Sequence, residues 1–428
     1  MSHVGPRLRK LRLNAGLTQQ ELAAPRYSAA YVSTIEASRR IPSKKALEHF
    51  ARGLGVDPEE LASGRSPGAR AELLAAYGDA RRILASGAAD AIEEAETRFG
   101  RLARRAKRDG FPEIEAKAWV GVGLCAETAS DLDGALSTYE QALALLAGES
   151  VVSRVDAIVG RARVLQVMGE VAYAAFLIEQ AIAELRDAGM NDPSSLLRLH
   201  SSLVAAYSDV GLIDRANSSA EIALGLAVAV DDAERLANMN LNVGIMLTHQ
   251  GQWREAETRF ADAERWFDEL HFAVDLARVR LVRGINLRNQ QRYDDARPHL
   301  EAARDVFASA GNALREARAT LHLGILERLT GRAEEARFVL KRAIALSGDD
   351  KGIAGIAERE LALCHAGHER AKTVAGLRKA IQLLQDAGIA KELAAAYRAL
   401  GDVLSKDKEL KPACDAYRKA ADLFERAA

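Results

Sequence analysis

Residues 17–56 read LTQQELAAPRYSAAYVSTIEASRRIPSKKALEHFARGLGV, and this stretch decides how the amino-terminal part of the chain folds. Thr18 followed three residues later by Glu21 is a capping box, in which both side chains accept hydrogen bonds from backbone amides at a helix start. Pro25 ends that helix, and Ser28 is a favourable cap for another helix that runs to about residue 37. The stretch therefore predicts two short consecutive helices joined by a tight turn.

One further helix is expected on each side of this pair. Residues 7–14 form a short basic helix that Gly16 closes, and Ser43 is placed to cap a fourth helix over residues 44–52. Eight apolar side chains would supply the small shared core: Leu8, Leu11, Leu17, Leu22, Val32, Ile35, Leu47 and Phe50. We therefore expect a four-helix unit within the first 53 residues.

The charge of the chain is distributed unevenly. Residues 1–52 carry ten Lys or Arg and three Glu, a net charge of +7, whereas the remainder carries 49 basic and 57 acidic residues, a net charge of −8. A basic head on an acidic body indicates that the head meets a polyanion and the body does not.

The order of motifs in the head is Leu-Thr-Gln, Glu-Leu-Ala, Tyr-Val-Ser-x-Ile-Glu and Arg-Arg-x-Pro-Ser. This order resembles the Xre/Cro-repressor type of helix-turn-helix domain over about residues 7–61. The turn at residues 24–27 is one residue shorter than the common form and lacks its glycine, which bears on the entry angle of the third helix.

The resemblance implies that the head binds double-stranded DNA, with the third helix in the major groove. The residues it places near base edges are Ser28, Ala29, Ala30, Tyr31, Ser33 and Thr34. The residues it places near phosphates are Gln19 at the start of the second helix, and Arg39, Arg40, Lys44 and Lys45. Thr18 is a further expected DNA contact. The two alanines can offer only apolar contact to a thymine methyl group. The alternative is a basic helical domain that docks a protein rather than DNA.

A short segment rich in Gly, Ser and Pro, residues 64–69, predicts a linker. Beyond it a signature of four positions recurs. A small residue is followed by Ala twelve positions later, by a bulky residue after four more positions, and by Ala after three more, as in Gly244, Ala256, Phe260 and Ala263. The central positions are Ala95, Ala135, Ala174, Ala216, Ala256, Ala296, Ala336, Thr373 and Ala413, in steps of 37 to 42 residues. Small residues let two antiparallel helices approach closely, so nine helical hairpins are predicted.

This periodicity resembles the tetratricopeptide repeat. We therefore expect an all-α chain: a lambda-repressor-like helix-turn-helix domain over residues 1–63, a linker over 64–69, and a superhelical solenoid of about nine hairpins over 70–428. Such hairpins stack with their first helices on a concave inner face. The combination of domains resembles the peptide-pheromone-responsive regulators of Gram-positive bacteria, and it also occurs in actinobacterial regulators without a known ligand.

The inner face of the first helices is the usual binding surface of such arrays. The candidate effector-binding residues on it are Arg198, Asn238, Asn242, His249, Arg278, Arg288, Asn289, Arg318, His322, Arg328 and Arg359. Asparagine can clamp the backbone of an extended peptide through one donor and one acceptor, and arginine can bind a carboxylate through two parallel hydrogen bonds. The alternative is that these side chains are solvated or paired with neighbouring Glu and Asp.

Other classes of protein find little support. The longest apolar stretch, from Ile222 to Val230, is too short to span a membrane. The start of the sequence lacks the apolar core of a signal peptide. Three widely spaced cysteines do not suggest a disulfide framework. We therefore expect a cytoplasmic protein. Residues 121–126 match a dinucleotide fingerprint loosely, but no strand precedes them, and we interpret their glycines as helix-packing positions. We expect no cofactor.

Cys364, His365 and His368 are close in sequence, but adjacent residues cannot easily face one ion, so no metal site is expected. No nucleophile with a plausible base is recognisable, and we predict that the chain is not an enzyme. The leading hypothesis is a homodimeric, effector-responsive transcriptional regulator. The alternative is an interaction scaffold, in which the array holds partner proteins and the head is a docking module.

Overall fold

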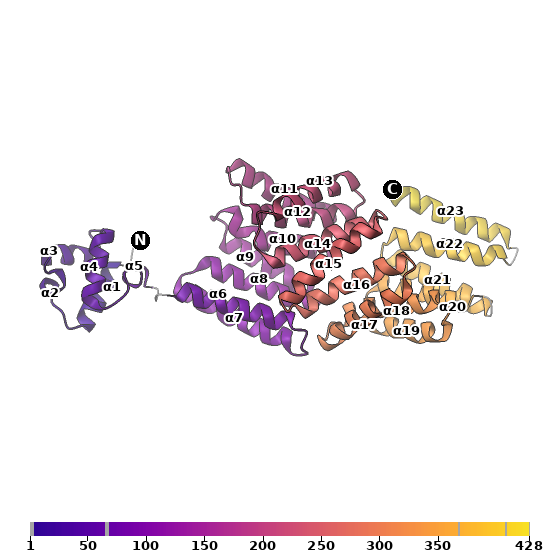
Figure 1. The fold of residues 1–428 in the computed structure, drawn as a ribbon, viewed down its shortest axis with the longest axis horizontal. Coiled ribbons are helices and arrows are strands. Elements are labelled where there is room, and N and C mark those ends of the chain that lie inside the picture. The colour runs from indigo at the N-terminus through magenta and orange to yellow at the C-terminus, as the bar shows by residue number, and fades with distance from the viewer. Residues whose placement is uncertain (1–3, 65–67, 367–368, 407–408, 428) are drawn as a thin grey trace. The chain divides into compact units, whose positions relative to one another are not determined.

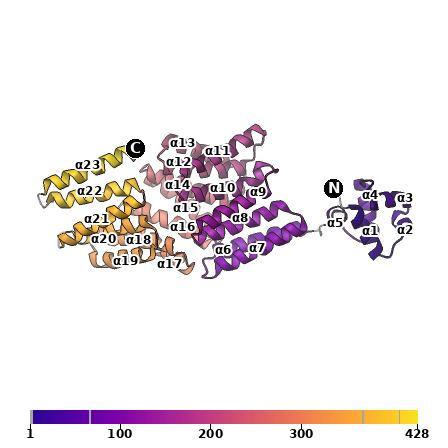
Figure 2. The ribbon, with the colours of Figure 1, turned by 180° about the vertical axis from the view of Figure 1, so that it is seen from behind.

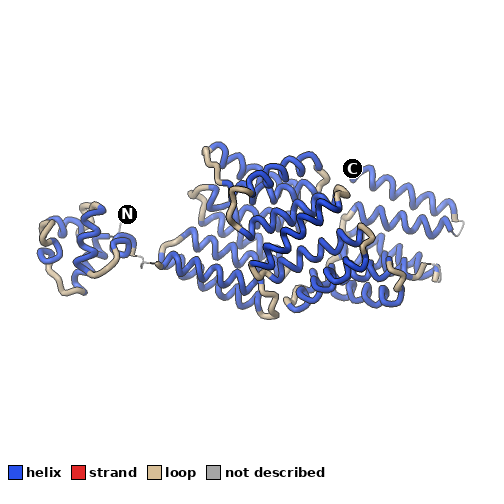
Figure 3. Tube along the Cα trace, in the orientation of Figure 1, coloured by secondary structure: helices blue, strands red, loops and turns tan. Residues whose placement is uncertain are grey.

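The computed structural model describes residues 4–64, 68–366, 369–406 and 409–427, and within these ranges all regular secondary structure is helical (Figure 3). Contacts between Cα atoms divide the chain into two units. One unit comprises Met1–Asp79 and Arg98–Ala118, and the other comprises Ala80–Thr97 and Trp119–Ala428. The predicted all-α architecture is confirmed.

The head contains the helices α1 (Val4–Asn14), α2 (Gln19–Ala23), α3 (Ala29–Glu36), α4 (Lys44–Leu54) and α5 (Pro58–Ser63). Each of the three predicted caps is present. Thr18 and Glu21 form the capping box of α2, Ser28 accepts a hydrogen bond from the backbone N–H of Tyr31, and Ser43 accepts one from that of Ala46. Local side-chain chemistry alone therefore placed these three helix starts.

The head differs from the sequence expectation at its two ends. Helix α1 begins at Val4 rather than at residue 7, and α5 was not predicted. Helix α4 ends at Gly55, whose φ of +67° suits glycine, and the chain then turns so that Leu61 of α5 becomes fully buried. The Arg7 guanidinium donates a hydrogen bond from Nη1 to the Leu61 carbonyl oxygen, 3.0 Å away. Helix α5 is too short to show periodicity, and its position depends on these contacts with α1 and α4.

The array follows in nine hairpins of a first and a second helix, counted over the part of the chain that the structure describes (Figure 1). In order, the pairs are α6 (Ala69–Ala85) with α7 (Ala91–Asp109), α8 (Pro112–Thr128) with α9 (Leu132–Leu145), α10 (Val151–Val167) with α11 (Val171–Asp187), α12 (Pro193–Asp209) with α13 (Ile213–Ala227), α14 (Ala233–His249) with α15 (Trp253–Glu269), α16 (Ala273–Asn289) with α17 (Tyr293–Ser309), α18 (Ala313–Leu329) with α19 (Ala333–Leu346), α20 (Lys351–Cys364) with α21 (Arg370–Asp386), and α22 (Ala390–Lys406) with α23 (Leu410–Ala427).

The repeat signature marks the contact between the two helices of a hairpin. All nine central residues, from Ala95 to Ala413, are buried near the start of a second helix, including the non-alanine Thr373. The small residue of the first helix faces the bulky residue of the second. A Cβ atom added at Gly244 would lie 2.6 Å from Phe260 Cε1, which is closer than atoms can pack. The glycine is therefore required for the close approach.

The repeats of about 40 residues, against 34 in the usual tetratricopeptide repeat, arise from long helices rather than long loops. Most helices of the array have 17 residues and are joined by short turns. Residues 121–126, with their two glycines, lie inside α8, and a Cβ atom at Gly123 would meet the ring of Tyr139. The loose dinucleotide fingerprint is thus a feature of helix packing.

From α12 to α20, each first helix contacts both helices of the preceding hairpin, and from α16 onward it contacts mainly the second of them. Helices α10, α12 and α14 contact one another in order and lie side by side in Figures 1 and 2. Within the second of the two units, helices far apart in the sequence also contact one another. Asn312 at the start of α18 donates a hydrogen bond from Nδ2 to the carbonyl oxygen of Thr128, 2.6 Å away. In the same unit, Arg81 pairs with Glu234 at 2.5 Å. These contacts join hairpins that are distant in the sequence.

Candidate functional site

The helix pair α2–α3 presents the residues expected to read DNA. Ser28, Ala30 and Ser33 are exposed on α3 or at its cap, and Ala29 and Thr34 are half-buried. Thr34 donates its hydroxyl proton to the Tyr31 carbonyl oxygen, 2.8 Å away. The exposed surface of α3 therefore consists of small side chains, which allow its backbone to approach a partner surface closely.

Tyr31 is placed differently from its neighbours on α3. Its ring is half-buried and stacks on Tyr27 at 5.3 Å between ring centroids, with Phe50 at 6.3 Å. The guanidinium of Arg40 lies over the same ring, 5.0 Å from its centroid. Tyr31 thus joins the aromatic side of the head core and holds Arg40 in place. This packing role is additional to the expected contact with bases.

Exposed cations surround α3. Arg39 and Arg40 follow α3, and Lys44 and Lys45 occupy the first turn of α4. Arg26, which the sequence reasoning missed, is exposed in the turn between α2 and α3. Among the described residues of the head, no carboxylate lies within ion-pair distance of these side chains. Together with the amino terminus of α4, they form a surface suited to phosphate groups. We call these five residues the basic rim.

A buried polar cluster behind α3 was not anticipated. Arg12 of α1 binds Glu36 of α3 through two hydrogen bonds, at 2.6 and 3.0 Å, and donates a third, at 2.8 Å, to the Leu17 carbonyl oxygen. Gln19, expected at a phosphate, donates from Nε2 to Glu36 Oε2 at 2.9 Å. Burial alone would raise the pKa of Glu36, but the hydrogen bonds from Arg12 and Gln19 lower it. The cluster therefore joins α1, α2 and α3 through one carboxylate.

Four of the expected effector-binding arginines are paired within the array. The pairs are Arg198 with Asp156 at 2.9 Å, Arg278 with Asp275 at 2.7 Å, Arg328 with Glu360 at 2.6 Å, and Arg359 with Glu360 at 3.0 Å and Glu392 at 2.6 Å. These residues match the alternative interpretation, in which arginines of the inner face serve intramolecular ion pairs.

Two of the expected asparagines also bond within the chain. Asn238 donates from Nδ2 to the carbonyl oxygen of Glu234 on its own helix, at 2.9 Å. Asn242 donates to the backbone carbonyl and to the hydroxyl oxygen of Ser201 on α12, at 3.0 and 3.1 Å. Asn242 therefore holds α14 against α12, and the donor expected to clamp a peptide is engaged in the structure.

Four of the remaining candidates lie on α16 and α18: Arg288, Asn289, Arg318 and His322. Arg288 Nη1 lies 2.9 Å from His322 Nδ1, and Arg288 Nη2 donates to Asn289 Oδ1 at 3.1 Å. Arg318 is exposed one turn before His322. Burial, together with the charges of Arg288 and Arg318, holds the pKa of His322 well below its usual value, so the imidazole is neutral and accepts from Arg288. His249 of α14 is also held neutral, since desolvation and the charge of Lys391 lower its pKa.

Arg315 belongs to this group, although sequence reasoning missed it. It lies three residues before Arg318 on α18, and burial together with the charge of Arg278 lowers its pKa to about 10. The helical spacing of Arg315, Arg318 and His322 was a signal that could have identified it. We call Arg288, Arg315, Arg318 and His322 the α16–α18 cluster.

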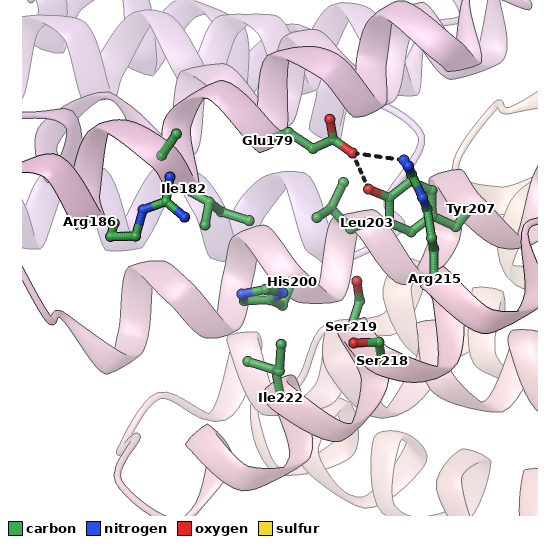
Figure 4. A pocket seen from close by; sticks show the side chains of 11 residues that line it. Glu179, Ile182, Arg186, His200, Leu203, Tyr207, Arg215, Ser218, Ser219 and Ile222 are labelled. Carbon is green, nitrogen blue, oxygen red and sulfur yellow. Dashed lines mark hydrogen bonds and ion pairs between the residues drawn. The ribbon is translucent and has the colours of Figure 1, made fainter.

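A separate cavity of about 400 Å³ lies between α11, α12 and α13 (Figure 4). Glu179 accepts hydrogen bonds from the Tyr207 hydroxyl and from Arg215, and His200 lies at the base of the cavity with Nδ1 unpaired. Desolvation lowers the pKa of His200. None of the residues expected to bind an effector lines this cavity, because it opens between second helices.

The remaining chemistry is limited. Cys364 is buried, which raises the pKa of its thiol, and His365 Nδ1 lies 3.1 Å from Glu369 Oε1, while His368 lies outside the described residues. Among the residues that the structure covers, no group of three potential ligands is arranged to hold a metal ion. No described helix combines the length and apolarity needed to cross a membrane.

Two family models match the chain. Residues 3–63 match the helix-turn-helix domain, and residues 275–348 match the tetratricopeptide repeat. Neither model describes an enzyme family. The sequence matches no curated protein.

Several solved structures share the fold. A Rap protein complexed with competence and sporulation factor is 12% identical, with a TM-score of 0.61, over 83% of this chain and 99% of the other. The apo form of the quorum sensor NprR from B. thuringiensis is 16% identical, with a TM-score of 0.55, over 82% and 99%. A signal-transduction ATPase with a tetratricopeptide-repeat sensor from Pyrococcus horikoshii is 14% identical, with a TM-score of 0.58, over 100% and 64%. The protein thus joins an amino-terminal helix-turn-helix domain to a tetratricopeptide-repeat array.

Proposed function

We propose that the protein is a cytoplasmic transcriptional regulator that binds specific DNA sites as a homodimer and responds to an effector bound by the array. One observation carries the DNA-binding part. The small exposed side chains of α3 are surrounded by the basic rim, whose cations have no carboxylate partner among the described residues of the head. A protein-docking head would not require so many unpaired cations around one helix.

The chemistry of these side chains indicates which would contact bases and which would contact phosphates. Ser28, Ser33 and Thr34 can exchange hydrogen bonds with base edges, and Ala29 and Ala30 can contact thymine methyl groups. Arg26, Arg39, Arg40, Lys44 and Lys45 would contact phosphates, which orients α3 but reads no sequence. Base discrimination then depends on few hydrogen bonds, so a second half-site adds much of the selectivity.

Selection from fragmented genomic DNA tests this function. The full chain is incubated with the fragments at about 150 mM salt and bound DNA is sequenced, including the region upstream of its own gene. A regulator enriches a few fragments that share a site with two half-sites about one helical turn apart. If no fragment is enriched over input, the DNA-binding proposal is wrong and the scaffold alternative is favoured.

A homodimer requires a surface that pairs with a second copy. The turns that join α10 to α11 and α12 to α13 carry large apolar side chains that are 43 to 64% exposed: Val167, Met168, Tyr173, Phe176, Val210, Leu212 and Ile213. Adjacent hairpins stack in parallel, so the two turns lie at the same edge of the array. An apolar patch of this kind marks an interface, and a DNA-binding head that recognises two half-sites needs a second copy of the same chain.

Replacing Phe176 and Leu212 by glutamate is expected to convert the dimer into a monomer, because two charges cannot be buried across this patch without partners. Light scattering coupled to size-exclusion chromatography gives the mass. Phe338→Glu is the control, since Phe338 on α19 is 73% exposed but lies away from the patch. A dimer that survives the double substitution would exclude this interface.

Effector binding would act by shifting a population. The array holds the two heads in arrangements that do or do not fit two half-sites, and an effector changes DNA affinity only if it binds one arrangement more tightly. The α16–α18 cluster is the place where an effector would bind, because the other candidate arginines of the inner face are already paired.

A further inference from the structure

Most arginines of the first helices form an ion pair with a carboxylate, and three do not. Helices α10, α12, α14, α16, α18 and α20 lie in a fully described part of the chain, Val151–Cys364, and they carry thirteen arginines. Ten of these have a carboxylate within 4 Å, as in the pair Arg163–Glu127. Arg288, Arg315 and Arg318 have none. All three belong to the α16–α18 cluster.

Two of the three exceptions, Arg288 and Arg318, lie near the same imidazole, that of His322. Arg315, Arg318 and His322 share one face of α18, at spacings of three and four residues. Arg288 reaches this face from α16, because its Nη1 lies 2.9 Å from His322 Nδ1. Arg288 also donates a hydrogen bond to the neutral amide oxygen of the adjacent Asn289. The cluster therefore combines three cations with neutral acceptors and contains no carboxylate of its own.

Such an arrangement costs folding free energy, because cations removed from water are stabilised mainly by an opposite charge. Burial lowers the pKa of both Arg288 and Arg315, with Arg328 adding to the effect at Arg288 and Arg278 at Arg315. The ten other arginines of these first helices avoid this cost by pairing with carboxylates. Glu360 and Glu392 act on Arg288, and Asp275 and Glu127 act on Arg315, only from beyond ion-pair distance. A direct ion pair is what a ligand carboxylate would add.

We propose that the α16–α18 cluster binds the carboxylates of an acidic peptide. This inference rests on the proposed effector role of the array and names the chemistry of the ligand. Arg318 would bind one carboxylate, and the Arg288–His322 pair would bind another. Arginine forms two parallel hydrogen bonds with a carboxylate, so each contact also fixes the orientation of the ligand.

The spacing of the cluster fits an extended peptide. Arg318 and His322 are four residues apart, which is about 6 Å along a helix axis. In an extended chain, side chains two residues apart lie on the same side and are separated by about 6.6 Å. Two acidic side chains separated by one residue can therefore meet Arg318 and Arg288 together. The half-buried Val282 and Ile285 of α16 lie between Arg278 and Asn289 at helical spacing and would contact apolar parts of the peptide.

Nucleic acid is the less suitable polyanion for this place. The chain beyond residue 52 has a net charge of −8, and Glu360 and Glu392 lie near enough to Arg288 to raise its pKa against the effect of burial. A phosphate backbone would extend past three cations into these carboxylates, whereas a short peptide can end before them. The observations thus favour a peptide with a few localised charges.

Affinity selection with defined peptide pools tests the proposal. The probes are capped pentapeptides with fixed second and fourth residues, either both Glu, both Gln or both Lys, and with the other positions drawn from uncharged residues. The full chain is mixed with each pool, separated from free peptide by gel filtration, and the retained peptides are quantified by mass spectrometry. We expect the Glu pool to be retained at least tenfold more than the Gln pool, and the Lys pool to be retained least.

Variants connect the retained peptides to the cluster. Arg288→Gln and Arg318→Gln should each lower retention of the Glu pool about tenfold, and Arg288→Glu with Arg318→Glu should switch the preference to the Lys pool. Arg342→Gln is the matched control, because Arg342 is an exposed arginine of the second helix α19 that pairs with Glu316 at 2.7 Å. Unfolding followed by circular dichroism checks that each variant folds.

The outcomes separate this proposal from the proposed function. Equal retention of the Glu and Gln pools, or retention that the cluster variants leave unchanged, would overturn the acidic-peptide proposal. Full displacement of the Glu pool by 10 mM inorganic phosphate would also overturn it, by showing a site for any anion. Genomic-fragment selection without peptide is measured independently and should not change in Arg288→Gln or Arg318→Gln, so failure of DNA binding and failure of peptide binding remain distinguishable.

Discussion

Arg39→Ala combined with Arg40→Ala is expected to weaken binding of the full chain to its DNA site by about ten- to a hundredfold at 150 mM salt. Each arginine that contacts a phosphate releases condensed cations on binding, so log K falls by about 0.9 per contact for each tenfold increase in salt. Loss of two contacts should therefore make the salt dependence shallower by about 2. Fluorescence anisotropy over 50 to 300 mM salt measures both quantities.

The control for this experiment is a similar pair of adjacent cations outside the head. Lys341 and Arg342 are exposed neighbours on α19, and their replacement by alanine should leave DNA affinity and its salt slope unchanged. Arg40 also lies over the Tyr31 ring, so Arg39→Ala alone separates loss of a phosphate contact from loosening of that ring. An unchanged slope in the double variant would remove these two arginines from the interface.

The second large effect is expected at the buried Arg12–Glu36 pair. Arg12→Ala leaves a carboxylate buried with Gln19 as its remaining partner in the cluster, and breaking a buried pair in this way costs about 3–5 kcal/mol. Since whole domains are stable by only about 5–15 kcal/mol, this loss removes a large share of the stability of the head. Hydrogen exchange should show lost protection in α1, α2 and α3 while the array stays protected, and DNA binding should fall.

A paired substitution shows whether the loss comes from the unpaired charge. Arg12→Leu with Glu36→Leu removes both charges and should restore most of the protection that Arg12→Ala loses, because apolar replacements of a buried pair are often neutral or better. If the double variant is as unstable as Arg12→Ala, packing rather than charge decides the effect.

The same pair gives a dependence on pH. The pKa of Glu36 is lowered in the folded head, so its contribution to stability is complete above its ordinary value of about 4.3 and is lost as pH falls through the lower folded value. Between pH 5 and pH 3 the native head should therefore lose more protection against hydrogen exchange than the Arg12→Leu, Glu36→Leu variant. Equal losses in the two proteins would show that Glu36 does not carry this dependence.

The sequence predicted correctly those features that depend on residues close together in the chain. Thr18, Ser28 and Ser43 each cap a helix by accepting a hydrogen bond from the backbone amide three residues later, so their chemistry could be recognised without knowledge of the fold. The repeat signature reports contacts within a single hairpin, such as Gly244 with Phe260, and recurs because each hairpin meets the same packing requirement.

The effector-binding residues show where that reasoning stops. The sequence identified Arg198, Asn242 and Arg288 by the same criterion, a polar residue expected on the inner face. In the structure, Arg198 pairs with Asp156 and Asn242 bonds to Ser201, whereas Arg288 meets only neutral partners. Apart from the adjacent Asn289, these partners lie 34 to 42 residues away on neighbouring hairpins, and periodicity within one helix carries no information about them.

The sequence alone therefore determined the starts of α2, α3 and α4, the nine hairpins and the basic character of the surface around α3. Each of these follows from residues within one or two helices, where the separation of two residues in the sequence sets the distance between their side chains. Only the tertiary structure decided which arginines are neutralised, which side chains form the buried cluster at Glu36, and where α5 packs. Those features depend on contacts between separate helices, and the free energy of a buried charge is set by whatever the fold places beside it.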